Sequence, residues 1–289
     1  MAKDTFFCPK QSICCQGRLI SLEQPRVMGI INLTPDSFYA GSRSLDISKV
    51  LKKAADMLEE GATFIDLGAA SSRPGSPLLD AETEQSRLLP ALRELRQSFP
   101  SALFSVDTYN ASTAAAAVHE GADMINDISG GSFDADMISR VAGLGVPFVI
   151  MHTSASPDRM QQNTRYGHLI KDIAAWFSER IRLSHMAGIA DLILDPGFGF
   201  GKTLAQNYQL LDALDYFQIF ELPIMVGVSR KSMISKVLDC QAEQALNGTT
   251  VLHALALQKG AGILRVHDVK EAVEAIKLME FHRLAQASL

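Results

Sequence analysis

The chain has 289 residues, of which 47% are hydrophobic, and its formal net charge is −5 at pH 7. This composition supports one large buried core, and the acidic balance argues against general binding to nucleic acid. No apolar run approaches the roughly 18 residues of a membrane span, and the N-terminal segment, MAKDTFFCPK, lacks the apolar stretch of a signal peptide. We therefore expect one domain spanning residues 1–289, without a membrane or nucleic-acid partner.

The first predicted element is a short β-hairpin over residues 12–24 that turns at Gln16–Gly17, placed to cover the bottom of a barrel. Eight apolar segments and eight amphipathic segments then alternate. We predict strands at 27–32, 63–67, 102–107, 123–127, 146–151, 192–195, 223–228 and 262–266, and helices at 46–60, 80–98, 110–120, 134–143, 168–187, 203–216, 241–259 and 268–285. This alternation predicts an α/β fold, a (β/α)8 TIM barrel. The alternative, an open doubly wound sheet, would be expected to carry a G-x-G-x-x-G motif after an early strand, and the sequence has none.

The cysteines indicate the compartment. Cys8, Cys14, Cys15 and Cys240 form no C-x-x-C pair, and no Cys/His cluster has the spacing of a zinc site. Because reduced thiols are typical of the cytosol, we predict a cytoplasmic protein.

Polar residues stand where apolar runs end. They are Asn32, Asp66, Asp107, Asn126, Asp195 and the Arg265–His267 pair. In a parallel barrel the carboxyl ends of the strands meet at one face, which carries the active site of the known barrel enzymes. We therefore expect these side chains to converge on one site, which predicts an enzyme.

The side chains of Asp107, Asn126 and Asp195 suit a flat heterocycle with a guanidine-like edge. A carboxylate accepts two N–H groups, and an amide both donates and accepts. The alternative is that each carboxylate caps the next helix, as Asp107 would cap the helix at 110–120. Met151, at the end of the fifth strand, could pack on a ring face or belong to the core.

Cationic residues near the last two strands suggest an anion site. Arg265 and His267 alternate with Val266 and so face the same way, and the loops after strands seven and eight are the habitual phosphate site of this fold. The alternative is that Asp268 caps the last helix and pairs with Arg265. Lys231, after the apolar run PIMVGV, is predicted at the barrel mouth, where it could reach a ring carbonyl or an anion. Asn32 is a neutral oxygen ligand suited to Mg²⁺.

Seven segments together resemble the motifs of the bacterial dihydropteroate synthase family. In chain order they are MGIINLTPDSF, SSRPGS, SVDTYNA, INDISGG, DPGFGFGK, GVSRKSMI and ILRVHDV, and they span residues 28–269. The resemblance implies a pterin-binding TIM barrel that works as a homodimer and requires magnesium. It also implies a transferase that joins p-aminobenzoate to (7,8-dihydropterin-6-yl)methyl diphosphate by SN1-like substitution, giving 7,8-dihydropteroate and pyrophosphate for folate biosynthesis.

The resemblance also implies roles for individual residues. The metal ligand would be Asn32; the pterin contacts Asp107, Asn126, Met151, Asp195, Gly227 and Lys231; the diphosphate contacts Ser72, Arg73, Arg265 and His267; and the p-aminobenzoate surroundings Phe38, Pro74, Phe200 and Ser232. Of these, Asn32, Lys231, Arg265 and His267 would be catalytic. The chain departs from the family pattern at Ala70, where many relatives carry an acid, and at Tyr39-Ala40-Gly41.

Two other functions remain open at this point. A methyltetrahydrofolate–corrinoid methyltransferase would share the Asp and Asn contacts but needs no diphosphate site, so the Ser-Arg-Lys and Arg-x-His motifs argue against it. A non-catalytic pterin-binding paralogue would have lost Asn32 or the loop motifs, and both are present.

Overall fold

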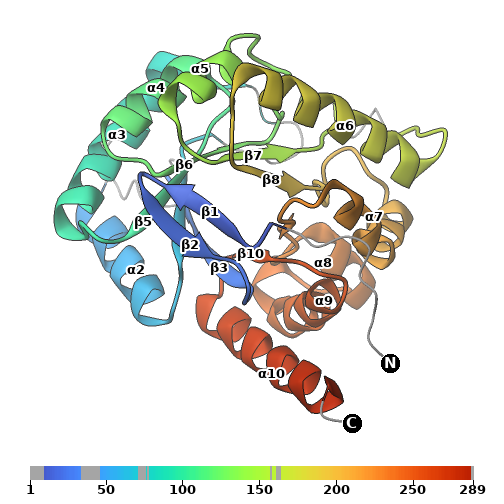
Figure 1. Cartoon of the computed structure of the whole chain (residues 1–289). Helices are drawn as coiled ribbons and strands as arrows, with labels where there is room; N and C mark the ends of the chain where they lie inside the picture. Colours follow the sequence, from blue (N-terminus) through green and yellow to red (C-terminus); the bar gives the residue numbers. More distant parts are fainter. Residues whose placement is uncertain are drawn as a thin grey trace.

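The computed structural model describes residues 10–33, 46–70, 76, 78–156, 158–160 and 164–287. Within these ranges eight parallel strands form the central sheet (Figure 1): β3 (Arg26–Asn32), β4 (Phe64–Gly68), β5 (Leu103–Asp107), β6 (Met124–Asp127), β7 (Phe148–Met151), β8 (Leu192–Asp195), β9 (Met225–Val226) and β10 (Ile263–Val266). Their order is β8-β7-β6-β5-β4-β3-β10-β9, and a parallel bridge between Leu194 and Ile224 joins the two ends of that order. The sheet is therefore a closed barrel, and the predicted fold class is confirmed.

Helices surround the barrel (Figure 1): α2 (Ile47–Glu59), α3 (Ala81–Ser98), α4 (Ala111–His119), α5 (Met137–Leu144), α6 (Leu169–Ala187), α7 (Leu204–Asp212), α8 (Ser232–Leu238), α9 (Leu246–Gln258) and α10 (Val269–Ala287). Local chemistry sets their ends. The Asp80 side chain caps α3, and Thr203 forms a capping box with Gln206 at the start of α7. Gly145 and Gly188 end α5 and α6 in the left-handed conformation. Within the described ranges, no helix combines the length and hydropathy needed to span a membrane.

Three predicted elements were wrong in their extent. The helix expected at 203–216 stops at Asp212 and continues as a 3-10 helix, η1 (Leu214–Phe220). The strand expected at 223–228 keeps only two residues, because the chain turns after it and α8, which was not predicted, follows at once. The helix expected at 241–259 divides into a 3-10 turn, η2 (Ala242–Gln244), and α9.

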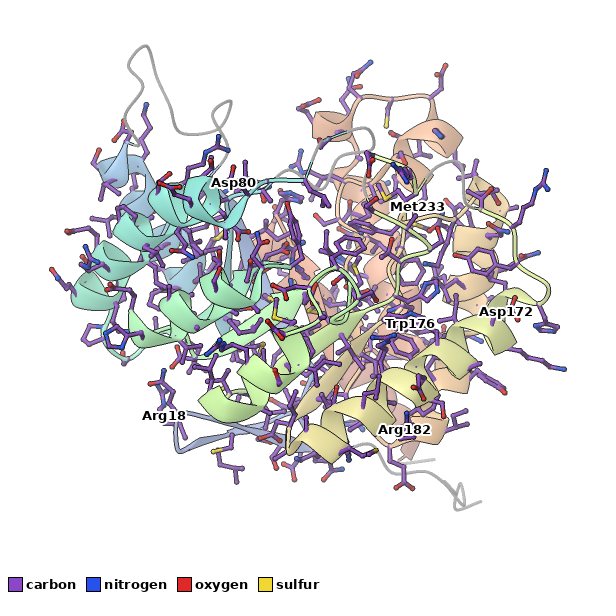
Figure 2. The ribbon with its side chains drawn as sticks, turned by 90° about the horizontal axis from the view of Figure 1, so that it is seen from above. Arg18, Asp80, Asp172, Trp176, Arg182 and Met233 are labelled. Atoms are coloured by element: carbon purple, nitrogen blue, oxygen red, sulfur yellow. The ribbon has the colours of Figure 1, made fainter. Side chains whose placement is uncertain are left out.

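The N-terminal hairpin closes the bottom of the barrel. Strands β1 (Ser12–Cys15) and β2 (Arg18–Ser21) join through Gln16 and Gly17, which both have positive φ. Ile13 and Cys15 pack on a layer to which each barrel strand contributes one side chain: Met28, Phe64, Leu103, Met124, Val149, Ile193, Met225 and Ile263. Figure 2 shows Arg18, on the hairpin, at one end of the molecule and Asp80 and Met233 at the other. The predicted hairpin and its position are confirmed.

Candidate active site

The alternation of side chains along each strand determines which residues face the interior of the barrel, where the candidate site lies. Successive side chains of a strand point to opposite faces, so the residues two positions beyond the apolar bottom layer also point into the barrel. They are Ile30, Asp66, Ser105, Asn126, Met151, Asp195, Gly227 and Arg265. One further step brings Asn32, Asp107, Ser229 and His267 to the mouth. The barrel is therefore apolar at the hairpin end and polar at the carboxyl end of its strands.

Arg265 is the centre of a buried hydrogen-bond network. Its Nε donates to Asp66 Oδ2 at 2.7 Å, and its Nη2 donates to Asp107 Oδ2 at 2.8 Å. The same Asp66 oxygen accepts from Asn126 Nδ2 at 3.1 Å. This network thus links Arg265 with three side chains from three other strands. Asp66 was expected at a strand end, but it lies in the middle of β4, one inward step deeper than Asp107.

Burial and opposite charge compete in this network. Desolvation raises the pKa of Asp107, whereas the Arg265 guanidinium opposes that rise. Burial disfavours the charge of Arg265 as well, but the carboxylates of Asp66 and Asp107 outweigh this effect and raise its pKa. We infer that the guanidinium stays charged and holds both carboxylates in place.

Asp195 and Lys231 form the second polar group. Asp195 is buried at the end of β8, where its Oδ1 accepts from Gly197 N at 2.8 Å. Lys231 Nζ donates to the Phe198 carbonyl at 2.6 Å and lies 4.8 Å from the centre of the Phe200 ring. Burial lowers the pKa of Lys231 to about 8, with Asp195 acting in the opposite direction. A Cβ on Gly227 would lie 3.7 Å from Lys231 Nζ, so this glycine sits directly beside the ammonium group.

Lys202, to which the sequence assigned no role, fixes the loop that carries these contacts. Its buried Nζ donates to the carbonyls of Gly197 at 2.9 Å and Phe200 at 3.1 Å, and lies 3.1 Å from His152 Nδ1. Burial lowers the pKa of Lys202 to about 7 and that of His152 well below its usual value. Gly197 has φ +71, and a Cβ there would lie 2.0 Å from the His152 carbonyl oxygen. The loop is therefore tightly packed around the Lys202 ammonium group and against the His152 backbone.

His267 lies at the barrel mouth beside Ser229. Its Nδ1 is 3.1 Å from Ser229 Oγ, which also accepts from the His267 backbone N–H at 3.2 Å. Although His267 keeps an exposed face, desolvation of its ring and the nearby Arg265 lower its pKa to about 4. The alternative pairing of Arg265 with Asp268 is wrong, because Asp268 pairs with Arg230 at 2.7 Å.

The helix-capping alternative for Asp107 is also wrong. Asp107 binds Arg265, and the first backbone N–H of α4, that of Ala111, donates to Asp134 at 2.8 Å instead. Asp127, the neighbour of Asn126, has a local structural role. It accepts from the backbone of Ser129 and Gly131, both at 2.7 Å, and so shapes the loop after β6.

An apolar group borders the polar layer. It consists of the buried residues Tyr109, Ile128, Met151, Met160 and Phe200, against which Ala70 packs. Met151 thus belongs to an apolar wall beside the polar site, apart from the main core. Ser232 is exposed at the start of α8, and Asn32 is half-buried at the end of β3. The predicted residues Phe38, Ser72, Arg73 and Pro74, and the departing segment at 39–41, lie outside the described residues.

Asp66, Lys202 and Ser229 are the site residues to which sequence reasoning gave no function. Alternation along β4, counted from Phe64, places Asp66 inside the barrel, and the same step from Gly227 leads to Ser229. Lys202 carried no such signal, because its burial depends on the fold of a glycine-rich loop.

A closed barrel with a buried arrangement of carboxylates, an amide and cations at its catalytic end is suited to a flat, hydrogen-bonding ligand. Residues 28–267 match the model of the pterin binding enzyme family. The dihydropteroate synthase of Escherichia coli K12 is 40% identical over 267 residues, which cover 92% of this chain and 94% of that protein. That of Bacillus subtilis 168 is 38% identical over 260 residues, covering 89% and 88%. The chain therefore belongs to the dihydropteroate synthase family of pterin-binding enzymes.

Solved structures agree with this assignment. Yersinia pestis dihydropteroate synthase, in a sulfonamide drug complex, is similar with a TM-score of 0.89 and 41% identity, covering 94% of this chain and 99% of that one. The Xanthomonas albilineans enzyme with 4-aminobenzoic acid has a TM-score of 0.88 and 36% identity, covering 94% and 98%.

Proposed function

We propose that this protein condenses (7,8-dihydropterin-6-yl)methyl diphosphate with p-aminobenzoate, giving 7,8-dihydropteroate and pyrophosphate for folate biosynthesis. The observation that carries the proposal is the group of Asp107, Asn126, Asp195, Lys231 and Arg265 at the carboxyl end of the barrel in a chain of this family. The related proteins are dihydropteroate synthases, which supports the same reaction.

The pterin would lie across the polar layer. Asp107 and Asp195 would accept N–H groups of the aminopyrimidinone edge, and Asn126 would pair with ring nitrogen or oxygen atoms. Lys231 would donate to a ring acceptor. Met151 and Phe200 would contact the ring faces, since both border this layer, and Gly227 would leave room beside the ammonium group.

The diphosphate would leave toward Arg265 and His267. When the methylene C–O bond breaks, its electron pair goes to the diphosphate, where Arg265 and the Ser72 and Arg73 side chains would disperse the charge. His267 would donate a hydrogen bond to the same group. The pterin ring delocalises the positive charge left on the methylene, so the substitution is SN1-like. The p-aminobenzoate nitrogen, bordered by Phe38, Pro74, Phe200 and Ser232, then forms the new C–N bond and releases its proton to solvent.

Asn32 is the residue we propose as the Mg²⁺ ligand. No cluster of three or more His, Cys, Asp or Glu side chains that could hold a metal occurs among the described residues. Asn32 would therefore supply one amide oxygen, and water and the substrate phosphates would complete the coordination, as Mg²⁺ prefers. Bound there, Mg²⁺ would neutralise charge on the diphosphate.

The test is an assay of pyrophosphate release by the purified chain. We expect release with both substrates and magnesium, with 7,8-dihydropteroate identified by mass. Absence of product at high enzyme concentration would contradict the proposal. Methyl transfer from methyltetrahydrofolate to a corrinoid, in place of product, would establish the competing function. Inhibition by a sulfonamide that competes with p-aminobenzoate would extend the similarity to the Yersinia pestis complex.

We also propose a cytoplasmic homodimer. The described cysteines, Cys14, Cys15 and Cys240, are free thiols, as a reducing compartment favours. Exposed apolar side chains on the adjacent helices α8 and α9, namely Val237, Leu238, Val251 and Leu255, offer a surface for a second copy. Light scattering should give twice the mass of the chain, and Leu255→Glu should reduce it to the monomer. A monomeric wild type would contradict the dimer.

A further inference from the structure

Asp66 occupies an unusual place beneath the proposed pterin site. It is fully buried in the middle of β4, and one of its oxygens, Oδ2, accepts from both Arg265 Nε at 2.7 Å and Asn126 Nδ2 at 3.1 Å. These two donors belong to residues that we place against different parts of the substrate. A single carboxylate oxygen therefore links two ligand-binding side chains.

The first consequence concerns the orientation of the Asn126 amide. A carboxylate ion-paired with arginine only accepts hydrogen bonds, so the NH2 group of Asn126 must face Asp66. The chemistry of the pair thus assigns the two ends of the amide, which are otherwise difficult to distinguish. The carbonyl oxygen of Asn126 is then left to accept an N–H group from the ring.

The second consequence concerns the plane of the Arg265 guanidinium. Asp66 holds Nε, and Asp107 holds Nη2 at 2.8 Å. Because the guanidinium is planar and rigid, two hydrogen-bonded N–H groups fix the orientation of its plane. Among the described residues no hydrogen bond engages Nη1, so Nη1 and the second N–H of Nη2 are the donors that remain for phosphate oxygens.

We propose that Asp66 is a positioning residue that orients both Asn126 and Arg265 for the pterin diphosphate. Asp66 acts through these two side chains, without contacting the substrate. The proposal rests on the proposed function, since it concerns binding of that substrate. It also predicts that the hydrogen-bond acceptor at Oδ2 matters more than the negative charge.

Three variants separate these roles. Asp66→Leu removes the acceptor and keeps the branched shape of the side chain, with two methyl groups in place of the two oxygens. Asp66→Asn keeps an acceptor oxygen that can occupy the Oδ2 position and receive both hydrogen bonds, but it removes the charge. Ser105→Ala is the matched control, because Ser105 is the register partner of Asp66 on β5, is equally buried, and has no hydrogen-bond partner for its hydroxyl in the described part of the chain.

The measurements are pterin affinity by calorimetry, with and without the diphosphate, and separate KM and kcat values for both substrates. Asp66→Leu should raise the KM for pterin diphosphate by at least about tenfold, because charge-assisted hydrogen bonds are lost. The KM for p-aminobenzoate should stay within about twofold of the wild-type value. Asp66→Asn should recover most of the affinity. In an Asn126→Ala background, Asp66→Leu should cost much less pterin affinity than in wild type, because the two residues act together.

Several results would overturn the inference. One is wild-type pterin affinity in Asp66→Leu. A second is an Asp66→Asn defect as large as that of Asp66→Leu, which would assign the effect to charge. A third is an equal loss for both substrates, or full additivity with Asn126→Ala, which would indicate a general packing role. If the wild-type protein bound no pterin, the proposed function would fail and this inference with it; if only the Asp66 variants behaved unexpectedly, the function would stand.

Discussion

Replacing Arg265 by alanine removes the cation that Asp66 and Asp107 share. Asp66 is completely buried, and Asp107 retains only 17% of its side-chain exposure. Breaking a buried ion pair from one side typically costs about 3–5 kcal/mol, because the partner charge stays buried without compensation. We expect Arg265→Ala to lower the free energy of unfolding by an amount in that range near pH 8.

The loss should depend on pH. Burial already raises the pKa of Asp107 while Arg265 opposes the rise, so removing Arg265 raises this pKa further. A carboxyl whose pKa is higher in the folded than in the unfolded state favours folding when protonated, and this contribution disappears as the pH rises through the folded pKa. Because the pKa of Asp107 in the wild type is already about 7, the difference from wild type should shrink as the pH falls from about 8 to about 7 and stay constant below.

Urea unfolding followed by circular dichroism at both pH values measures this difference. The control is Arg182→Ala, which breaks an exposed pair with Glu179 and should leave the stability nearly unchanged at either pH. The triple variant Arg265→Ala, Asp66→Asn, Asp107→Asn should recover part of the stability. A loss below about 1 kcal/mol near pH 8, or one that does not change with pH, would refute the view that Arg265 neutralises two buried carboxylates.

Other substitutions test the remaining parts of the site. Asp195→Asn should weaken pterin binding by about 2–4 kcal/mol, because the amide presents a donor to a ligand donor; unchanged affinity by calorimetry would remove Asp195 from the site. The kcat/KM for pterin diphosphate should fall above about pH 8 as Lys231 loses its proton. In Lys231→Met this decline of kcat/KM at high pH should vanish. If it persisted, it would come from titration of the ligand and not of Lys231. Gly197→Ala should cost about 1–3 kcal/mol of stability and most of the activity, since its Cβ meets the His152 carbonyl. Gly143→Ala, with open space around the new methyl group, should be tolerated, and equal behaviour of the two variants would contradict the packing argument.

The sequence by itself determined the barrel and the membership of its polar layer. Each buried strand is a short apolar run, and a polar residue at its carboxyl end has to reach the same face as the others. Asp107, Asn126, Asp195 and Arg265 were therefore identifiable from position alone, and the structure brings all four to the catalytic end of the barrel. The hairpin was equally local, because the Gln16–Gly17 turn and its flanking residues specify it.

Only the tertiary structure decided which of these groups pair. Arg265 could bind Asp268, three positions away, yet its partners Asp66 and Asp107 lie 199 and 158 residues away. Closure of the barrel places β10 beside β3 and brings these groups together. The burial of Lys202 against His152, and the division of the segment after β9 into α8, η2 and α9, likewise depend on packing. Periodicity in a sequence specifies which face a side chain occupies, but burial and partner charge, which set pairing and pKa, arise only when distant strands meet.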